Sequence, residues 1–146
     1  MKDNKALVLT LIQYSTLAIM MWQMPWFNST WLILLLIEFL GFIIAALALY
    51  EMNKSKINIS PTPRKDAFLV RTGVYSIIRH PMYSSLLLIF VPILISNYTI
   101  SNLIIFTIFF INIILKLTYE EKLLKVFFKD YPEYAAETKR IIPFIY

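Results

Sequence analysis

The stretch PMYSSLLLIFVPILISNYTISNLIIFTIFFINIIL, residues 81–115, contains no charged side chain. Uncharged apolar runs of about 18 residues or more are typical of membrane-spanning helices, and this run is long enough for two. The polar group SNYT, residues 96–99, interrupts it near the middle and predicts a turn. We therefore expect a hairpin of two rather short membrane-spanning helices, at about residues 81–96 and 99–117.

Two more apolar runs precede this hairpin. They predict spans at about residues 6–22 and 31–50, separated by a turn that contains Pro25 and Asn28. The chain is 59% apolar and 16% charged, whereas soluble domains are nearer half apolar and a quarter charged. The sequence therefore predicts an all-α integral membrane protein, a single domain with a bundle of four transmembrane helices.

The basic residues indicate how this bundle lies in the membrane. Every lysine and arginine lies in the N-terminal tail, in the segment 51–80 or from residue 116 onward. Four spans place these three segments on one face, and basic segments mark the cytoplasmic side. We expect both termini to be cytoplasmic, in a multi-pass protein of a prokaryotic cell membrane.

The charge and the cysteine count also limit the partners. Orientation and contact with membrane lipids account for the net charge of +5, so no nucleic-acid partner is implied. The chain has no cysteine and one histidine, which argues against a metal site. The sequence does not indicate an oligomeric state.

The tail after the fourth predicted span keeps a helical pattern. Apolar side chains recur there at helical spacing, with lysines between them: Leu123, Leu124, Phe127, Phe128 and Tyr131. This pattern predicts an amphipathic helix that continues out of the fourth span along the cytoplasmic membrane surface. Pro132 is expected to end or bend that helix, because proline lacks a backbone N–H donor.

Scarce polar side chains gather just before the hairpin, in RTGVYSIIRHPMY, residues 71–83. A basic loop of this kind can be a topology signal only, with Pro81 at a first helical position. From the spacing of these residues alone, a topology signal and a functional site are equally open interpretations. Gly73 predicts a tight turn that brings the backbone close to another group. The start of the following helix also offers free N–H groups to an anionic ligand.

Two blocks of the sequence resemble the isoprenylcysteine carboxyl methyltransferase family. The first block is G-x-Y-x-x-x-R-H-P-x-Y at residues 73–83, and the second is EEKLLKVFFKDYPEYAAETKRIIPF at residues 120–144. They occur in the family's order, separated by a helical hairpin, and the resemblance covers about residues 60–146. It implies an integral-membrane enzyme that uses S-adenosylmethionine, with the cofactor site formed by the 51–80 loop and the 118–146 tail.

The resemblance also implies which side chains form that site. Glu120 would hold the amino group of the cofactor. A basic residue four positions before this glutamate contacts the substrate in the family, and this chain has Lys116 there in place of the usual arginine. The remaining implied cofactor-binding residues are Phe68, Leu69, Val70, Tyr75, His80, Pro81, Met82 and Tyr83.

Methyl transfer from a sulfonium requires an aligned donor and acceptor, and it needs neither a metal nor a covalent enzyme intermediate. A carboxylate acceptor requires an orienting cation, for which Arg79 and Lys116 are candidates. An amine acceptor must lose a proton, which Glu121 or His80 is suited to accept. The predicted catalytic residues are therefore Arg79, Lys116 and Glu121. The predicted substrate is a lipophilic or lipidated molecule that enters from the bilayer, such as a prenylcysteine-like carboxylate.

Other functions remain open on the sequence. A membrane reductase of the steroid-reductase type, which uses NADPH, has a similar architecture in its C-terminal half. A four-span small transporter would use Glu38, because a carboxylate within a span is functional by default unless it is protonated and bonded to Gln13 or Tyr14. A catalytically silent homologue is the last alternative. The methyltransferase hypothesis requires Tyr83 and Glu120 to share one cavity.

Overall fold

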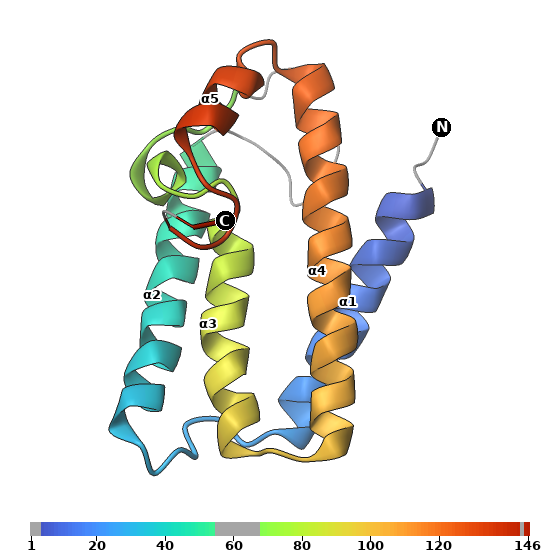
Figure 1. Ribbon diagram of the computed structural model, residues 1–146, viewed down its shortest axis with the longest axis vertical. Helices are drawn as coiled ribbons and strands as arrows, with labels where there is room; N and C mark the ends of the chain where they lie inside the picture. The colour runs from blue at the N-terminus through green and yellow to red at the C-terminus, as the bar shows by residue number, and fades with distance from the viewer. Residues whose placement is uncertain (1–3, 55–67, 144) are drawn as a thin grey trace.

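The computed structural model describes residues 4–54, 68–143 and 145–146, and in these ranges the chain is helical without a strand. The all-α prediction is confirmed. The four longest helices run alternately down and up the long axis of the molecule (Figure 1). In chain order the elements are α1 (Asn4–Gln23), α2 (Leu32–Lys54), the 3-10 helix η1 (Gly73–Ser76), α3 (Pro81–Ser96), α4 (Ile100–Phe127) and α5 (Tyr131–Glu137).

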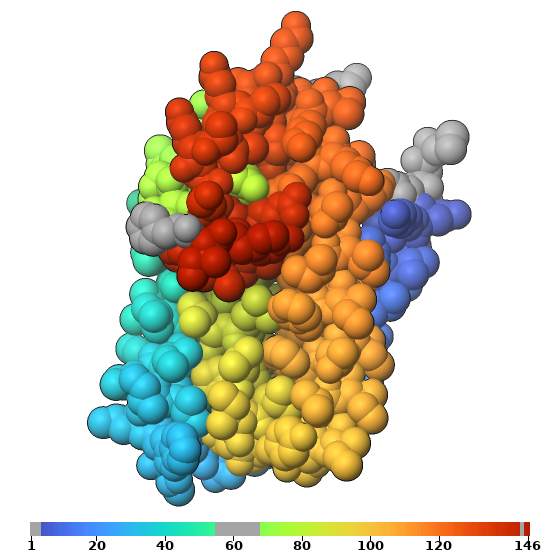
Figure 2. Space-filling model, viewed as in Figure 1, coloured from blue at the N-terminus to red at the C-terminus, as the bar shows by residue number. Residues whose placement is uncertain are grey.

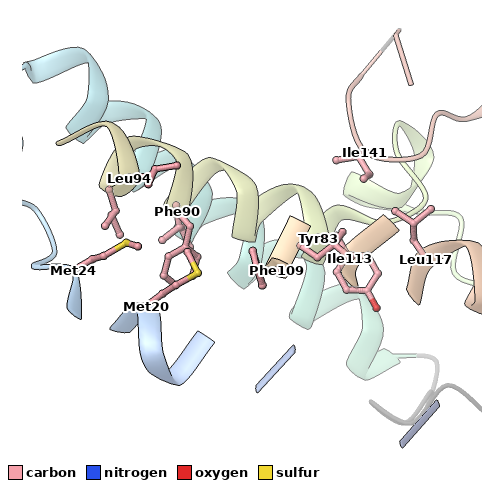
Figure 3. Packing of buried hydrophobic residues seen from close by; sticks show 11 residues of the cluster. Met20, Met24, Tyr83, Phe90, Leu94, Phe109, Ile113, Leu117 and Ile141 are labelled. Atoms are coloured by element: carbon pink, nitrogen blue, oxygen red, sulfur yellow. The ribbon is translucent and has the colours of Figure 1, made fainter. Parts of the chain in front are cut away.

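The bundle consists of two helix pairs. α2 packs along α3, α1 packs along α4, and the pairs meet where α3 faces α4 (Figure 1). Gly41 permits the close approach of α2 to α3, since a Cβ at this position would lie 3.0 Å from the carbonyl oxygen of Ser85. The core between the pairs is apolar, and Figure 3 shows its main members: Met20, Met24, Tyr83, Phe90, Leu94, Phe109, Ile113, Leu117 and Ile141.

The turn between α3 and α4 coincides with the predicted break at residues 96–99. The backbone N–H of Asn97 closes the end of α3 with a 3.0 Å hydrogen bond to the carbonyl of Ile93. Thr99 caps the start of α4, where its hydroxyl accepts a 3.1 Å hydrogen bond from the N–H of Asn102. A capping hydroxyl of this kind satisfies one of the free donors at a helix start, so the polar residues of this break both end one helix and begin the next.

Three helices, α1, α2 and α4, are long and apolar enough to cross a membrane. α3 is equally apolar but has 16 residues, or about 24 Å of helix, whereas the hydrocarbon core of a bilayer is about 30 Å thick. Many large apolar side chains are exposed along the helices, as expected for surfaces that contact lipid. The chain is a multi-pass membrane protein, and a fourth crossing by α3 stays a prediction.

The C-terminal part departs from the predicted amphipathic surface helix. α4 continues as one helix to Phe127, and the chain then turns at residues 128–130. Pro132 lies in the first turn of α5, so the prediction that it ends or bends a helix is wrong. Proline is tolerated there because the first N–H groups of a helix have no intrahelical acceptor. Figure 2 shows the C-terminal segment lying over the beginning of α3.

One end of the bundle gathers the elements next to the basic segments. The start of α1, the end of α2, η1 and α5 all lie toward the upper end in Figure 1. The turns that join α1 to α2 and α3 to α4 lie at the opposite end. This arrangement agrees with basic segments on a single membrane face, and the cytoplasmic assignment of that face stays a prediction.

Candidate functional site

A cavity of about 340 Å³ opens among α1, α2, α3, α4, η1 and α5. This volume lies within the range of small-molecule and cofactor sites. Most of the residues predicted for the cofactor and catalytic site line it, although they come from distant parts of the chain. These residues are Leu69, Val70, Tyr75, Arg79, His80, Met82, Tyr83, Lys116 and Glu120.

Three predicted site residues do not line the cavity. Phe68 is 55% exposed at the start of the segment that leads to η1. Pro81 is fully buried at the first position of α3, where its ring suits the helix start. Glu121 is buried, and its carboxylate is held by Arg140 outside the cavity lining as well as by Arg79 within it.

Tyr83 and Glu120 meet across the cavity. The Tyr83 hydroxyl donates a 2.7 Å hydrogen bond to Oε1 of Glu120, which joins the beginning of α3 to the last third of α4. The His80 ring stacks on the ring of Tyr83 with centroids 5.6 Å apart, and its Nδ1 lies 3.9 Å from Oε2 of Glu120. The two sequence blocks thus contribute to one polar cluster, as the methyltransferase hypothesis requires.

Tyr75 is positioned over this cluster by η1. Its hydroxyl lies 3.5 Å from the sulfur of Met52, and its carbonyl accepts a 2.7 Å hydrogen bond from the Tyr134 hydroxyl. Burial, and to a lesser degree the negative charge of Glu120, raises the pKa of Tyr75 to about 12. The phenol is therefore neutral at any ordinary working pH.

The predicted tight turn at Gly73 is present. Gly73 has φ +59°, in the left-handed region that favours glycine. A Cβ there would lie 2.9 Å from the Glu51 side chain, whose carboxylate also accepts a 2.6 Å hydrogen bond from the Thr72 hydroxyl. The close approach fixes η1, and with it Tyr75, against the end of α2.

Glu121 forms the centre of a buried ion-pair cluster beside the cavity. Its Oε1 lies 3.0 Å from Nε of Arg79 and 3.5 Å from Nε2 of His80, and its Oε2 lies 2.9 Å from a guanidinium nitrogen of Arg140. Arg79 also donates to the carbonyls of Ala135 and Thr138. The guanidinium of Arg79 is thus occupied by the protein itself, in contacts that attach the C-terminal segment to the bundle.

Backbone contacts strengthen the same attachment. The N–H groups of Arg79 and His80 donate to the carbonyls of Lys139 and Arg140, at 2.7 and 3.0 Å. The Ser84 hydroxyl donates to the carbonyl of Ile141 at 2.6 Å. The segment after α5 therefore pairs with residues 79–84 and keeps His80 turned toward α4.

Lys116 is a buried cation of the cavity wall. It is 6% exposed, and its ammonium donates a 2.6 Å hydrogen bond to Oε1 of Gln13 on α1. The ammonium also lies 5.9 Å from the centre of the Tyr83 ring. Within the described residues, Lys116 has no ion pair with a carboxylate.

Some lining residues were not predicted from the sequence. They include Tyr131 and Tyr134 of α5, and burial raises the pKa of both phenols. The Tyr131 hydroxyl is buried near the guanidinium of Arg79, but it forms no hydrogen bond of good geometry among the described residues. The unpredicted lining residues are Gln13, Tyr14, Leu17, Ala45, Leu49, Met52, Ser85, Leu86, Leu124, Tyr131 and Tyr134. The spacing of the two tyrosines after the Glu pair was the available signal for α5. For α1 the signal was a glutamine, Gln13, in the middle of a mainly apolar helix.

Glu38 lies apart from this site. It is 2% exposed on α2 and does not line the cavity. One of its carboxylate oxygens has no hydrogen-bond partner in the described structure. The predicted partner Gln13 instead accepts from Lys116, so the structure does not link Glu38 to the polar cluster.

Comparison with protein families gives a match that spans most of these elements. A family model described as phospholipid methyltransferase matches residues 31–131. This range runs from the residue before α2 to the first residue of α5, and it leaves α1 outside. No curated protein and no solved structure matches the chain.

Proposed function

The chain belongs to the phospholipid methyltransferase family, and we propose that it transfers a methyl group from S-adenosylmethionine to a lipophilic acceptor in the cavity. Members of this family are membrane methyltransferases, in one superfamily with the isoprenylcysteine enzymes that the sequence resembles. The observation that carries the assignment of the site is the contact between Tyr83 and Glu120, which joins the two sequence blocks at one cavity.

The polar cluster of Glu120, Tyr83, His80 and Tyr75 suits the methyl donor. S-adenosylmethionine supplies a methyl group already activated on a positively charged sulfur, and it also carries an amino group. Glu120 can accept from that amino group and still accept from Tyr83, because a carboxylate has several acceptor sites. The faces of Tyr75 and Tyr83 would stabilise a nearby cation by about 0.5–2 kcal/mol.

The unsatisfied hydroxyl of Tyr131 supports the fit. A buried hydroxyl without a partner costs free energy, so such groups normally have one. A polar cofactor in the cavity would provide it. The contribution of the protein to the rate would then be alignment of donor and acceptor, worth about 7–11 kcal/mol in well-oriented reactions, together with exclusion of water.

The apolar part of the cavity suits a lipid-like acceptor. It is formed by Leu17 of α1, Ala45 and Leu49 of α2, and Leu86 of α3. Lys116, between this part and Glu120, would orient the head of the acceptor, which we propose to be a phospholipid amine or a prenylcysteine-like carboxylate. Catalysis by Lys116 in this role requires only its charge and its position, so the lysine is compatible with activity.

The proposed roles of the other candidate catalytic residues are revised by their contacts. Glu121 and Arg79 are engaged with each other and with the C-terminal segment, so we propose that both position the site. For an amine acceptor, His80 beside Glu120 is the better candidate to accept the proton, since its ring lines the cavity.

The alternative functions receive less support. The phosphates of NADPH require cations, and the cations in the described cavity lining are Arg79 and Lys116. Arg79 is occupied by Glu121 and backbone carbonyls, which leaves one ammonium for several phosphate charges. A transporter based on Glu38 would need that residue on a polar path, and Glu38 lies outside the cavity.

The proposed topology follows from the basic segments. We propose that both termini and the polar cluster face the cytoplasm, where the water-soluble donor is available. The acceptor would enter from the bilayer, between the helices. This division accounts for a polar cluster at one end of an otherwise apolar bundle.

Calorimetric titration of the purified full chain in detergent tests the donor. We expect S-adenosylhomocysteine, the product of the donor, to bind, and NADPH to give no saturable heat. Saturable binding of NADPH together with no binding of S-adenosylhomocysteine would favour the reductase and reject the proposal.

A further inference from the structure

The helix outside the family match contributes to the cavity. α1 supplies Gln13, Tyr14 and Leu17 to the lining, although the phospholipid methyltransferase model begins at residue 31. Gln13 is 7% exposed on a helix that is otherwise mainly apolar. A buried amide in such a helix needs a partner, and its partner is the ammonium of Lys116, 103 residues away in the chain.

Two matched contacts join α1 to α4 at this level. Asn112 donates a 3.1 Å hydrogen bond to the carbonyl of Leu9, and Lys116 donates a 2.6 Å bond to Gln13. The second pair lies four residues further along each helix, and because α1 and α4 run in opposite directions the two contacts lie close together at the same level of the bundle. Lys116 and Gln13 line the cavity, whereas Asn112 and Leu9 do not. A contact that only held the helices together would not need to face the cavity.

The ammonium of Lys116 has no carboxylate within ion-pair distance in the described part of the chain. Gln13 is uncharged, and the carboxylate of Glu120, one turn along α4, attracts the ammonium only from beyond that distance. Buried charges are normally paired, because removal of a charge from water is costly. An oxyanion on a bound molecule would complete this site.

The Lys116 site adjoins the proposed donor site, because its ammonium lies 5.9 Å from the centre of the Tyr83 ring. Lys116 lies four residues before Glu120 on α4, a displacement of about 6 Å along the helix axis. The apolar side chains of Leu17 and Leu86 also line the cavity. A molecule with an apolar chain and an oxyanion head therefore fits this end, beside the position of the donor.

We propose that Gln13 is a specificity-determining residue that holds the Lys116 ammonium toward the oxyanion of a lipophilic acceptor. This inference rests on the proposed function in one respect, the identification of the bound molecule as the methyl acceptor. The neutral amide is essential to it, since a carboxylate at position 13 would pair with the ammonium and compete with the ligand. Acceptor selectivity is thus determined partly by α1, the part of the bundle that the family model does not cover.

Binding of matched twelve-carbon amphiphiles to the full chain in nanodiscs of zwitterionic lipid tests the proposal. The probes are dodecanoate, dodecyl phosphate and dodecanol, which share a chain and differ in the head. We expect the wild type to bind at least one anionic probe about tenfold or more tightly than dodecanol. Stronger binding of dodecanoate assigns a carboxylate head, and stronger binding of dodecyl phosphate assigns a phosphate head.

Substitutions at position 13 provide the decisive comparison. Gln13→Glu retains the shape of the side chain and should abolish the preference for the anionic probe, and Gln13→Leu should reduce it. Asn112→Leu removes the neighbouring contact between α1 and α4 and should keep the preference. An unchanged preference in Gln13→Glu, or an equal loss in Asn112→Leu, would overturn the inference.

Titration with S-adenosylhomocysteine distinguishes failure of the proposed function from failure of the proposed role of Gln13. The Gln13 variants should bind it within about twofold of the wild type, because Gln13 is on the acceptor side. Failure of the wild type to bind it, with the anionic preference intact, rejects the proposed function and leaves the oxyanion site. Normal binding with no effect of Gln13→Glu on the amphiphiles rejects the inference alone.

Discussion

Replacement of Glu120 by glutamine tests the proposed donor site at a single charge. Glutamine keeps the length of the side chain and can still accept the hydrogen bond that the Tyr83 hydroxyl donates at 2.7 Å. It removes the negative charge that would hold the amino group of the donor. The Glu120 side chain is 20% exposed, so this charge acts in a largely desolvated position.

The size of the expected effect follows from that position. A hydrogen bond to a charged group contributes about 1.5–3 kcal/mol, which corresponds to a loss of affinity of about 10- to 150-fold. We therefore expect the dissociation constant of S-adenosylhomocysteine to rise by this factor in Glu120→Gln. Calorimetric titration of the purified variant in detergent measures it directly, and the thermal unfolding midpoint reports whether the variant is folded.

Glu133→Gln is the matched control. Glu133 is an exposed carboxylate of α5 that does not line the cavity, and its replacement should leave the dissociation constant unchanged. Equal affinities for wild type and Glu120→Gln would refute a role of the Glu120 charge in donor binding. A loss of affinity in Glu133→Gln as large as that in Glu120→Gln would refute it equally.

Other predictions concern the framework around the site. Glu121→Gln leaves two arginines without their shared carboxylate, and at 6% side-chain exposure we expect a loss of about 3–5 kcal/mol in unfolding free energy; a midpoint of thermal unfolding equal to that of the wild type argues against a positioning role. Gly41→Val should cost about 1–3 kcal/mol, because its side chain would collide with α3 at Ser85, and an unaltered midpoint would contradict the close packing of α2 on α3. The raised pKa of Tyr75, about 12 against an ordinary 10.0, predicts that its contribution to stability is complete below pH 10.0 and is lost as the pH rises toward 12. An ultraviolet titration of the phenols in wild type and in Tyr75→Phe measures this pKa, because the difference between the two curves is the titration of Tyr75. A difference curve centred near pH 10 would contradict the raised pKa.

Much of the fold follows from local features of the sequence. The apolar run at 81–115 is too long for one helix, and Asn97 and Thr99 supply the end of α3 and the cap of α4. Pro81 is compatible with a helix only near its start, so the beginning of α3 was predictable. The end of α4 was not, because the apolar pattern predicted a helix that continues out of the span toward Pro132, whereas α4 ends at Phe127.

The lining of the cavity was predictable where a motif identified its residues and unpredictable where only packing placed them there. Tyr83 and Glu120 belong to the two blocks, and their contact agrees with the inferred convergence. Glu121 is next to Glu120 in sequence, but consecutive residues on a helix point in different directions, and Glu121 faces the arginines. Gln13 lies on a helix whose packing partner, α4, is about a hundred residues away, and no local pattern indicates which helices pack together.

The most direct test of the central claim is transfer of labelled methyl groups. The purified full chain would be incubated with methyl-labelled S-adenosylmethionine and a total lipid extract, and the extract would be separated to find the labelled species. We expect label in a lipophilic species with the wild type and a strong loss of labelling with Glu120→Gln. Absence of label from every lipid fraction, in a preparation that is folded and binds S-adenosylhomocysteine, would contradict the account.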